Sequence, residues 1–204
     1  MKEQAAQHVH TKGTKRMFKN PVLERLTRTH ISVPLIVFSI YSGGLIYYSI
    51  SVSKMDPLMV VGLFFTGLLT WTFVEYMAHR YIFHMSTHTK IRKKIQYTFH
   101  GVHHDYPKDK DRLAMPPLVS VTIATILLFL FRLVMGDFTF AFLPGFLMGY
   151  AGYLFVHYIT HAYPPPKNSF KVLWVNHGIH HYKAPDKAFG VSSPLWDYIF
   201  RTMP

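Results

Sequence analysis

Four long stretches of this chain carry almost no charge, and they limit the folds open to it more than any other feature. They cover residues 31–52, 57–74, 115–136 and 138–157, and Arg132 is the one Lys, Arg, Asp or Glu within them. Because the hydrocarbon core of a bilayer is ~30 Å thick, a helix needs about 20 apolar residues to cross it. Four such runs exceed what a soluble protein of 204 residues could surround. The sequence therefore predicts an all-α integral membrane protein with four transmembrane helices.

The links between these stretches predict how the helices are connected and on which side of the membrane each segment lies. Residues 53–56 and 136–137 are short links, so we expect two antiparallel hairpins. All Lys and Arg residues except Lys54 and Arg132 then lie on one face, which the positive-inside rule makes cytoplasmic. We expect a multi-pass protein of a bacterial inner membrane or the endoplasmic reticulum, with both termini cytoplasmic. Residues 1–30 form a basic cytosolic segment in this prediction, and residues 31–204 form the membrane-embedded domain.

The composition excludes several classes of protein. The chain has no cysteine, which rules out a disulfide scaffold, an iron–sulfur cluster and a thiol nucleophile. Its net charge of +12 follows from the basic segments on one side of the membrane, where they attract anionic lipid headgroups. The charge therefore predicts contact with the lipid bilayer and requires no nucleic acid.

Ten of the 14 histidines fall into four spaced clusters, all on the predicted cytoplasmic side. Residues three or four apart share a helix face, so we expect the histidines of each HxxHH or HxxxH cluster to point at one ion. The HxxxxH pair needs a helix end or a bend between its members. Imidazole binds zinc, copper, iron and nickel, and ten ligands exceed what a single ion takes, so two metal ions are implied. The candidate ligands are His79, His84, His100, His103, His104, His157, His161, His177, His180 and His181. We expect no metal role for His8, His10, His30 and His88.

Two carboxylates stand beside these clusters. Glu75 precedes His79 by four residues on the same predicted helix face, where it could accept the second ring N–H of that ligand and fix its orientation. An interfacial glutamate that simply reaches water is an equally good interpretation. Asp105 follows His104 directly and could have a similar supporting role.

Three further residues are candidates for contact with a lipid substrate. Arg112 precedes the third apolar stretch, where it could bind a headgroup or an acyl carboxylate, or serve as an interfacial anchor. Tyr153 and Tyr150 lie one and two helical turns before His157 and could border an acyl channel. Aromatic residues at such positions are more often interfacial or part of helix packing.

A metal centre at the membrane face suits a substrate that is itself a lipid. If the attacked position is an unactivated C–H bond, no side-chain acid or base is strong enough, and a redox metal that activates dioxygen is needed. The spacing of the histidines does not identify the metal.

Four segments resemble the fatty acid hydroxylase superfamily of integral-membrane di-iron oxygenases. They are residues 73–84 (FVEYMAHRYIFH), 100–104 (HGVHH), 109–117 (DKDRLAMPP) and 189–197 (FGVSSPLWD). These phrases are similar to fatty acid 2-hydroxylases in particular, and the resemblance extends from about residue 60 to the C-terminus. It implies four membrane helices with a cytosolic helical cap, in which the ten clustered histidines hold two iron ions, or zinc if the protein is mis-metallated.

The resemblance also implies a reaction. Dioxygen would be the co-substrate, and a hydroxyl group would be placed on the carbon next to the carbonyl of a long-chain acyl group, in the synthesis of sphingolipids such as ceramide. Some members carry a cytochrome-b5-type haem domain at the N-terminus, for which the 30-residue head is too short. We therefore expect a separate electron donor of cytochrome b5, ferredoxin or reductase type.

Two other functions remain open. A carotenoid or sterol hydroxylase of the same superfamily would use the same histidines on a polyene or ring-shaped substrate. A metal transporter would need polar ligands near the middle of the bilayer, whereas the histidines here lie at the predicted membrane rim.

Overall fold

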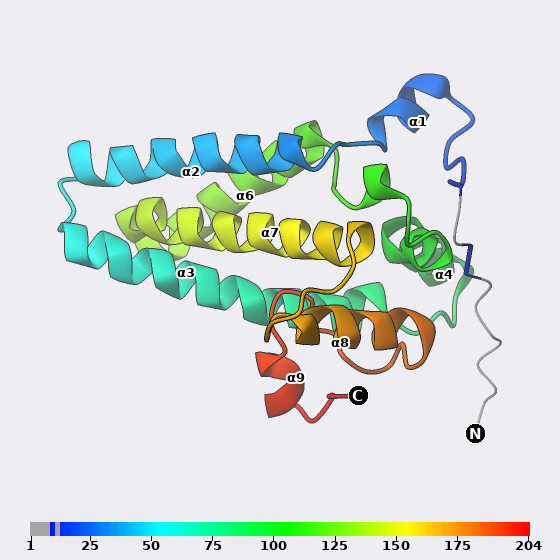
Figure 1. Ribbon diagram of the computed structural model, residues 1–204. Coiled ribbons are helices and arrows are strands. Elements are labelled where there is room, and N and C mark those ends of the chain that lie inside the picture. Colours follow the sequence, from blue (N-terminus) through cyan, green and yellow to red (C-terminus); the bar gives the residue numbers. More distant parts are fainter. Residues whose placement is uncertain (1–8, 11–12) are drawn as a thin grey trace.

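The computed structural model describes residues 9–10 and 13–204, and this part of the chain contains helices and no strand. Four long helices lie alongside one another, and shorter helices gather at one end of them (Figure 1). The long helices are α2 (Ser32–Ser51), α3 (Pro57–Ala78), α6 (Pro117–Met135) and α7 (Thr139–Ala162). The shorter α-helices are α1 (Pro21–Leu26), α4 (Lys90–Gln96), α5 (Val102–Asp105), α8 (Lys171–Tyr182) and α9 (Leu195–Ile199). Two π-helical turns, η1 (His79–Phe83) and η2 (Tyr97–Gly101), and two 3₁₀ turns, η3 (Lys110–Arg112) and η4 (Gly136–Phe138), complete the set.

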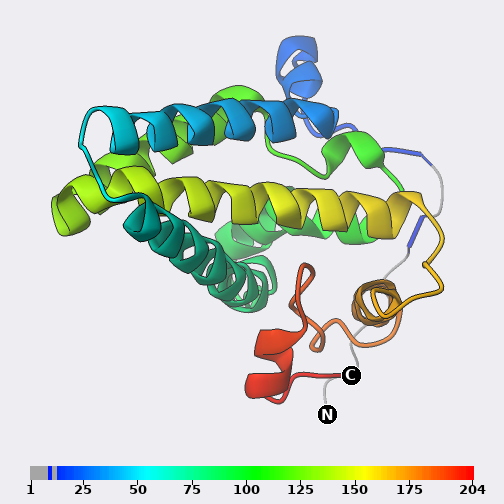
Figure 2. The same ribbon diagram turned by 60° about the vertical axis from the view of Figure 1, so that its left-hand side comes forward.

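Within the described residues, three largely helical stretches are long and apolar enough to cross a membrane: Ser32–Ser51, Pro57–Phe83 and Lys110–Ala162. The third has 53 residues and contains both α6 and α7, which the 3₁₀ turn at Gly136 separates into a hairpin (Figure 2). Gly136 has a φ of 57°, a conformation that glycine adopts at little cost. Large apolar side chains project outward from these stretches; Leu133 is 84% exposed and Leu58 is 80% exposed. Such faces suit contact with lipid.

The start of α3 follows from a local sequence signal, whereas the ends of α3 and α7 differ from the prediction. Asp56 caps α3 by accepting hydrogen bonds from the backbone N–H groups of Leu58 and Met59, and Pro57 occupies the first turn. The apolar stretches predict ends at residues 74 and 157, whereas α3 continues to Ala78 and α7 to Ala162. Polar and ionisable side chains in those last turns find partners in the cap, so a polar residue there does not mark a helix end.

Helix α7 is the centre of the bundle and packs against α2, α3 and α6. Its backbone lies close to that of α3 at Gly145, where an added Cβ atom would overlap the carbonyl oxygen of Phe64. Likewise, a Cβ atom on Gly67 would overlap the carbonyl oxygen of Phe142. The two glycines therefore set the distance between these helices, and four of the ten clustered histidines lie in α7 or directly after α3.

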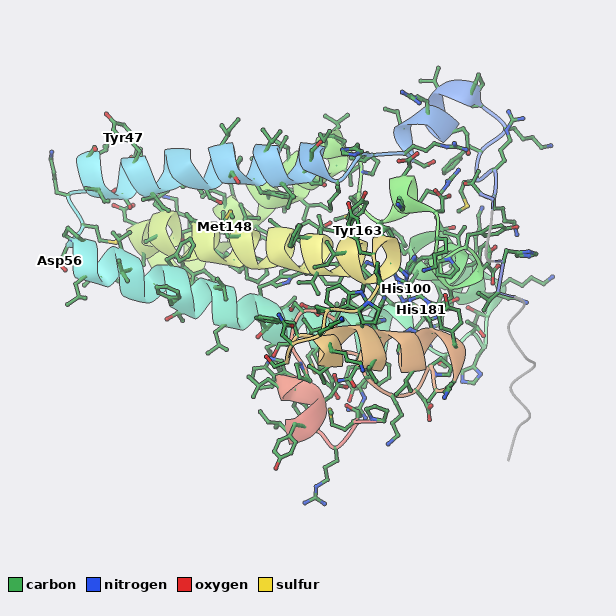
Figure 3. All side chains as sticks on the ribbon, viewed as in Figure 1. Tyr47, Asp56, His100, Met148, Tyr163 and His181 are labelled. Atoms are coloured by element: carbon green, nitrogen blue, oxygen red, sulfur yellow. The ribbon has the colours of Figure 1, made fainter. Side chains whose placement is uncertain are left out.

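The shorter elements and the loops between them form a cap at one end of the bundle. In Figure 3, Asp56 marks the opposite end, where α2 and α3 are joined, while His100 and His181 lie within the cap near the end of α7. The cap therefore gathers segments that are far apart in the sequence at the end of the bundle where α3 and α7 finish.

Candidate metal centre

The ten clustered histidines meet in two groups of five at the junction of the bundle and the cap. Within each group, one ring nitrogen from every histidine lies within 4.8 Å of the others, and all but one of the ten residues are fully buried. The first group is His79, His84, His100, His104 and His180. The second group is His103, His157, His161, His177 and His181. Each group could hold a metal ion.

The spacing of the ring nitrogens fits metal coordination. In the first group, the Nε2 atom of His100 lies 3.1 Å from that of His79 and 3.0 Å from that of His104. In the second group, the Nε2 atom of His103 lies 2.8 Å from that of His157 and 3.1 Å from that of His181. Two nitrogens that bind one ion at about 2.1 Å and at right angles are about 3 Å apart. These distances therefore match neighbouring ligands around an ion.

Burial, together with hydrogen bonds at two of the rings, keeps these imidazoles in the form that binds a metal. The Nδ1 atom of His79 lies 2.5 Å from the carbonyl oxygen of Phe189, and that of His180 lies 2.7 Å from the carbonyl oxygen of Lys187. A carbonyl only accepts, so Nδ1 carries the proton and the lone pair of Nε2 faces the group. Burial lowers the pKa of His180 to about 4 and that of His84 to about 3. Both rings are therefore neutral at physiological pH.

The structure corrects the expectation that each HxxHH cluster serves one ion. In α8, His177 and His181 belong to the second group, whereas His180 belongs to the first. Residues four apart are separated by about 40° around a helix, but neighbouring residues are separated by about 100°. The same division places His100 and His104 in the first group and His103 in the second. Each HxxHH cluster therefore lies between the two groups and contributes to both.

The five-residue spacing of His79 and His84 is accommodated by the π-helical turn η1. The backbone N–H of His84 donates to the carbonyl oxygen of His79 at 3.1 Å, which is the i to i+5 bond of a π-helix. Because this turn contains one more residue than an α-helical turn, side chains five apart return to the same side. Both imidazoles thus reach the first group from the end of α3.

Glu75 supports the first group through the loop of residues 189–192 rather than by the expected direct contact. The ring N–H partner of His79 is the carbonyl of Phe189, as described above. The buried carboxylate of Glu75 instead accepts the backbone N–H of Val191 at 2.7 Å and that of Ser192 at 2.8 Å, and it also bonds the Ser192 hydroxyl. It holds the loop whose carbonyl orients His79.

A second buried carboxylate, Asp197, holds the same loop, and the sequence analysis did not single it out. Its oxygens accept the backbone N–H of Phe189 at 2.8 Å and that of Gly190 at 2.7 Å, and the hydroxyl of Thr202 at 2.7 Å. The only available signal was the phrase at residues 189–197, which ends on this aspartate.

Asp105 and Arg112 are turned away from both groups. Asp105 accepts a hydrogen bond from the Tyr97 hydroxyl at 2.7 Å, so the expected contact with the neighbouring His104 is not made. Arg112 is nearly buried and binds Glu24 and Asp109, with a hydrogen bond of 2.9 Å to the Thr27 hydroxyl. Its guanidinium ties the N-terminal segment to the cap, and its contact with a lipid headgroup or acyl carboxylate stays a prediction.

Tyr150 and Tyr153 form an aromatic row that ends at the second group. The ring of Tyr153 stacks on His157 at a centroid distance of 5.5 Å, and the ring of Tyr150 stacks on Tyr153 at 6.1 Å. Trp71 of α3 packs against Tyr150 at 4.8 Å. The row runs from the apolar bundle to a candidate ligand.

The histidines predicted to have no metal role lie outside both groups, as far as the structure describes them. His10 stacks on Tyr106, the Nδ1 atom of His30 lies 2.8 Å from the Ser32 hydroxyl, and His88 is exposed. His8 lies outside the described residues.

The two groups predict the metal content of the protein. We expect close to two metal ions per chain in purified protein, because each group supplies five converging nitrogens. Elemental analysis by mass spectrometry, with protein quantified by amino-acid analysis, measures this ratio. A ratio of one or less in fully folded protein would contradict the assignment of two sites.

Comparisons with known proteins place these features in a family. The fatty acid hydroxylase family model matches residues 64–202. The dihydroceramide fatty acyl 2-hydroxylase FAH2 of Arabidopsis thaliana is 37% identical over 192 residues, which cover 93% of this chain and 80% of that protein. The fatty acid 2-hydroxylase of Mus musculus is 39% identical over 160 residues, which cover 74% of this chain and 42% of that protein.

A solved structure has the same fold. The hydroxylase domain of full-length scs7p superposes with a TM-score of 0.85 at 31% identity, covering 95% of this chain and 73% of that chain. The matched region includes all ten clustered histidines and the loop that orients them. This chain belongs to the fatty acid hydroxylase family.

Proposed function

We propose that this protein is a membrane-bound fatty acid 2-hydroxylase, which places a hydroxyl group on the carbon next to the carbonyl of long-chain acyl groups used in sphingolipid synthesis. The observation that carries the proposal is the pair of five-histidine groups at the end of an apolar helical bundle. The relatives named as acyl 2-hydroxylases support the position of attack.

We propose that the two groups of histidines hold two iron ions. Iron with dioxygen supplies the oxidising power for a C–H bond, which no side chain has. The residues of the chain keep the ligands neutral, exclude water and orient the rings: the carbonyls of Phe189 and Lys187 fix His79 and His180, and the carboxylates of Glu75 and Asp197 hold the loop that carries Phe189.

The arrangement in the membrane is proposed from the bundle and the charges. The long stretch Lys110–Ala162 would cross twice as α6 and α7, which gives four spans with α2 and α3. Both termini and the cap would then be cytoplasmic, the N-terminal 30 residues forming a basic cytosolic segment.

The aromatic row suggests how the substrate reaches the metal centre. Tyr150 and Tyr153 lead from the lipid-facing bundle to His157, so an acyl chain that follows them would bring its carbonyl end to the second group. We propose that their rings border the chain and hold it in one orientation.

Two electrons are needed for each hydroxylation, and neither the acyl chain nor dioxygen supplies them. We propose an external donor, a one-electron carrier protein of cytochrome b5 or ferredoxin type or its reductase.

Product analysis tests the reaction. Cells that express the protein should gain 2-hydroxy fatty acids in their hydrolysed lipids, measured by mass spectrometry against cells with the empty vector. Because the ligands act as a set, a variant lacking His180 should give no gain. Hydroxylated carotenoids or sterols without any 2-hydroxy acid would contradict the proposal.

Thiol labelling tests the sidedness. The native chain has no cysteine, so single cysteines at residues 95 and 170 are unique targets. In intact cells or sealed vesicles, a membrane-impermeant reagent should modify both only from the cytoplasmic side, because residue 95 lies in α4 and residue 170 directly precedes α8, both in the cap. Labelling of either position from the opposite side would overturn the topology.

A further inference from the structure

We propose that the surface formed by Arg80, Lys90, Arg92, Lys93 and Lys94, here called the basic face, is where an acidic one-electron carrier protein docks. The inference rests on the proposed function, since it places the entry of the electrons that the hydroxylation needs. Beyond the proposed function, the inference names the surface at which the electrons enter and the candidate ligand, His84, through which they reach the metal centre.

A cavity connects the basic face to the metal centre. It has a volume of about 400 Å³ and is lined by Arg80, Tyr81, His84, Met85, Ser86 and Arg92. Among the ten candidate ligands, His84 is the one that is not fully buried. Electron tunnelling slows steeply with distance, so the thinnest protein cover is the favoured entry. The cavity at His84 is that place.

The charged side chains that line the cavity, Arg80 and Arg92, are both basic, and so are the other charged residues of the segment around it. No Asp or Glu occurs between Glu75 and Asp105, whereas five Lys and Arg residues do. Four of the five are exposed, and none of the five forms an ion pair within the described part of the chain. Arg80 is held in place by a hydrogen bond of 2.7 Å to the Tyr76 hydroxyl. Unpaired charges of one sign attract a partner of opposite sign and raise its rate of association.

The position and the mixed chemistry of the face favour a protein partner over the bilayer. Figure 1 shows α4 past the ends of α2 and α7, at the end of the molecule away from the turn between α2 and α3. Ile91 is 72% exposed and Phe99 is 65% exposed, whereas His100, the next residue, is buried in the first group. Exposed apolar side chains among basic ones are the combination found in protein interfaces, where the apolar residues are buried and the charges form the rim.

The electron count sets how the carrier is used. Each hydroxylation converts one C–H bond and one dioxygen, with two electrons and two protons, into one C–OH group and one water. A carrier that is oxidised by one electron at a time must dock twice for each product. The interface should therefore be weak and rapidly exchanging, with charge attraction governing the rate of association.

A binding measurement tests the face without requiring turnover. The full chain in nanodiscs is titrated with the soluble haem domain of a cytochrome b5 or with a plant-type ferredoxin, both acidic carriers. The double variant Lys93→Glu/Lys94→Glu should bind at least about tenfold more weakly at low salt, because two attractions become repulsions. Wild-type binding should weaken as salt is raised, and binding of the variant should depend on salt much less.

The matched control is Lys167→Glu/Lys171→Glu, which reverses two exposed charges before and at the start of α8. It changes the net charge equally and should bind the carriers like the wild type. If charge reversal disturbs α4, the neutral variant Lys93→Gln/Lys94→Gln, checked for metal content and monodispersity, should show a smaller loss in the same direction.

The outcomes separate this proposal from the proposed function. Any of three results would overturn the docking face. They are equal carrier binding by the wild type and Lys93→Glu/Lys94→Glu, an equal loss of carrier binding in the control variant, and no salt-sensitive binding by the wild type. A single cysteine at position 93 tests contact with the membrane. If phosphatidylglycerol nanodiscs shield it from thiol reagents and phosphatidylcholine nanodiscs do not, the basic face binds lipid, and the docking proposal is overturned. The two proposals can also fail separately. If binding is salt-sensitive and is lost only in Lys93→Glu/Lys94→Glu, the docking face is supported. If the same protein makes no 2-hydroxy acid even with dithionite as reductant, the proposed reaction is refuted.

Discussion

Replacing His103 by alanine is expected to lower 2-hydroxylation by more than about 100-fold. Loss of a residue that only hydrogen-bonds a metal ligand lowers activity by about 10- to 100-fold, and loss of a ligand itself should cost more. Its Nε2 atom lies 2.8 Å from that of His157 and 3.1 Å from that of His181. The variant therefore removes the nitrogen that faces two other ligands. The measurement is the amount of 2-hydroxy acid per unit of protein in expressing cells, together with the metal content of the purified variant.

The matched control for this variant is His88→Ala. His88 is exposed and belongs to neither group of five, so this change should leave most of the activity and the full metal content. Substantial activity in His103→Ala, or an equal loss in His88→Ala, would refute the assignment of the ligands.

Replacing Gly145 by valine is expected to prevent α3 and α7 from packing. A Cβ atom at this position would overlap the carbonyl oxygen of Phe64, which is part of the backbone and cannot rotate away. Adding groups to a well-packed interior costs about 1–3 kcal/mol, and the cost is greater when a backbone must move. We expect a large loss of monodisperse protein and a lower midpoint of thermal unfolding for whatever is recovered.

Gly152→Val is the control on the same helix. A Cβ atom on Gly152 would meet nothing within 4 Å, so this variant should unfold at nearly the same temperature as the wild type. Comparable instability in the two variants would show that valine weakens α7 wherever it is placed and that the close approach of the helices is not the cause.

The long helices could be predicted from the sequence because a local property determines them. An uncharged stretch must be buried or face lipid, and Asp56 with Pro57 marks a helix start that can be read from neighbouring residues. The ends at Ala78 and Ala162 could not be predicted in this way. They depend on whether Glu75, His157 and His161 find partners in segments more than 15 residues away, such as His177 and Ser192.

The ten converging histidines could be predicted as a set of residues, but their division into two groups could not. Ten histidines in repeated spacings indicate two ions, yet the division of each HxxHH cluster between the groups depends on where the other segments lie. The partners that orient the ligands were also beyond prediction, because the carbonyls of Phe189 and Lys187 belong to the backbone and have no sequence signature. The expected contact of Asp105 with His104 is not made, because Asp105 accepts a hydrogen bond from Tyr97 instead. Arg112 pairs with Glu24, a partner that proximity in the sequence does not reveal.

The interleaving of the ligands has a consequence for the order in which the protein is made. Both groups take histidines from α8, and the loop that orients His79 depends on Asp197, seven residues before the end of the chain. Synthesis proceeds from the N-terminus at about 5–20 residues per second, so the membrane helices are complete before either site exists. Until α8 has been made, neither group of five histidines is complete. We therefore expect any metal to bind only after α8 and α9 have been made, and a variant without α9 to lack the contacts of Asp197 that hold the loop orienting His79.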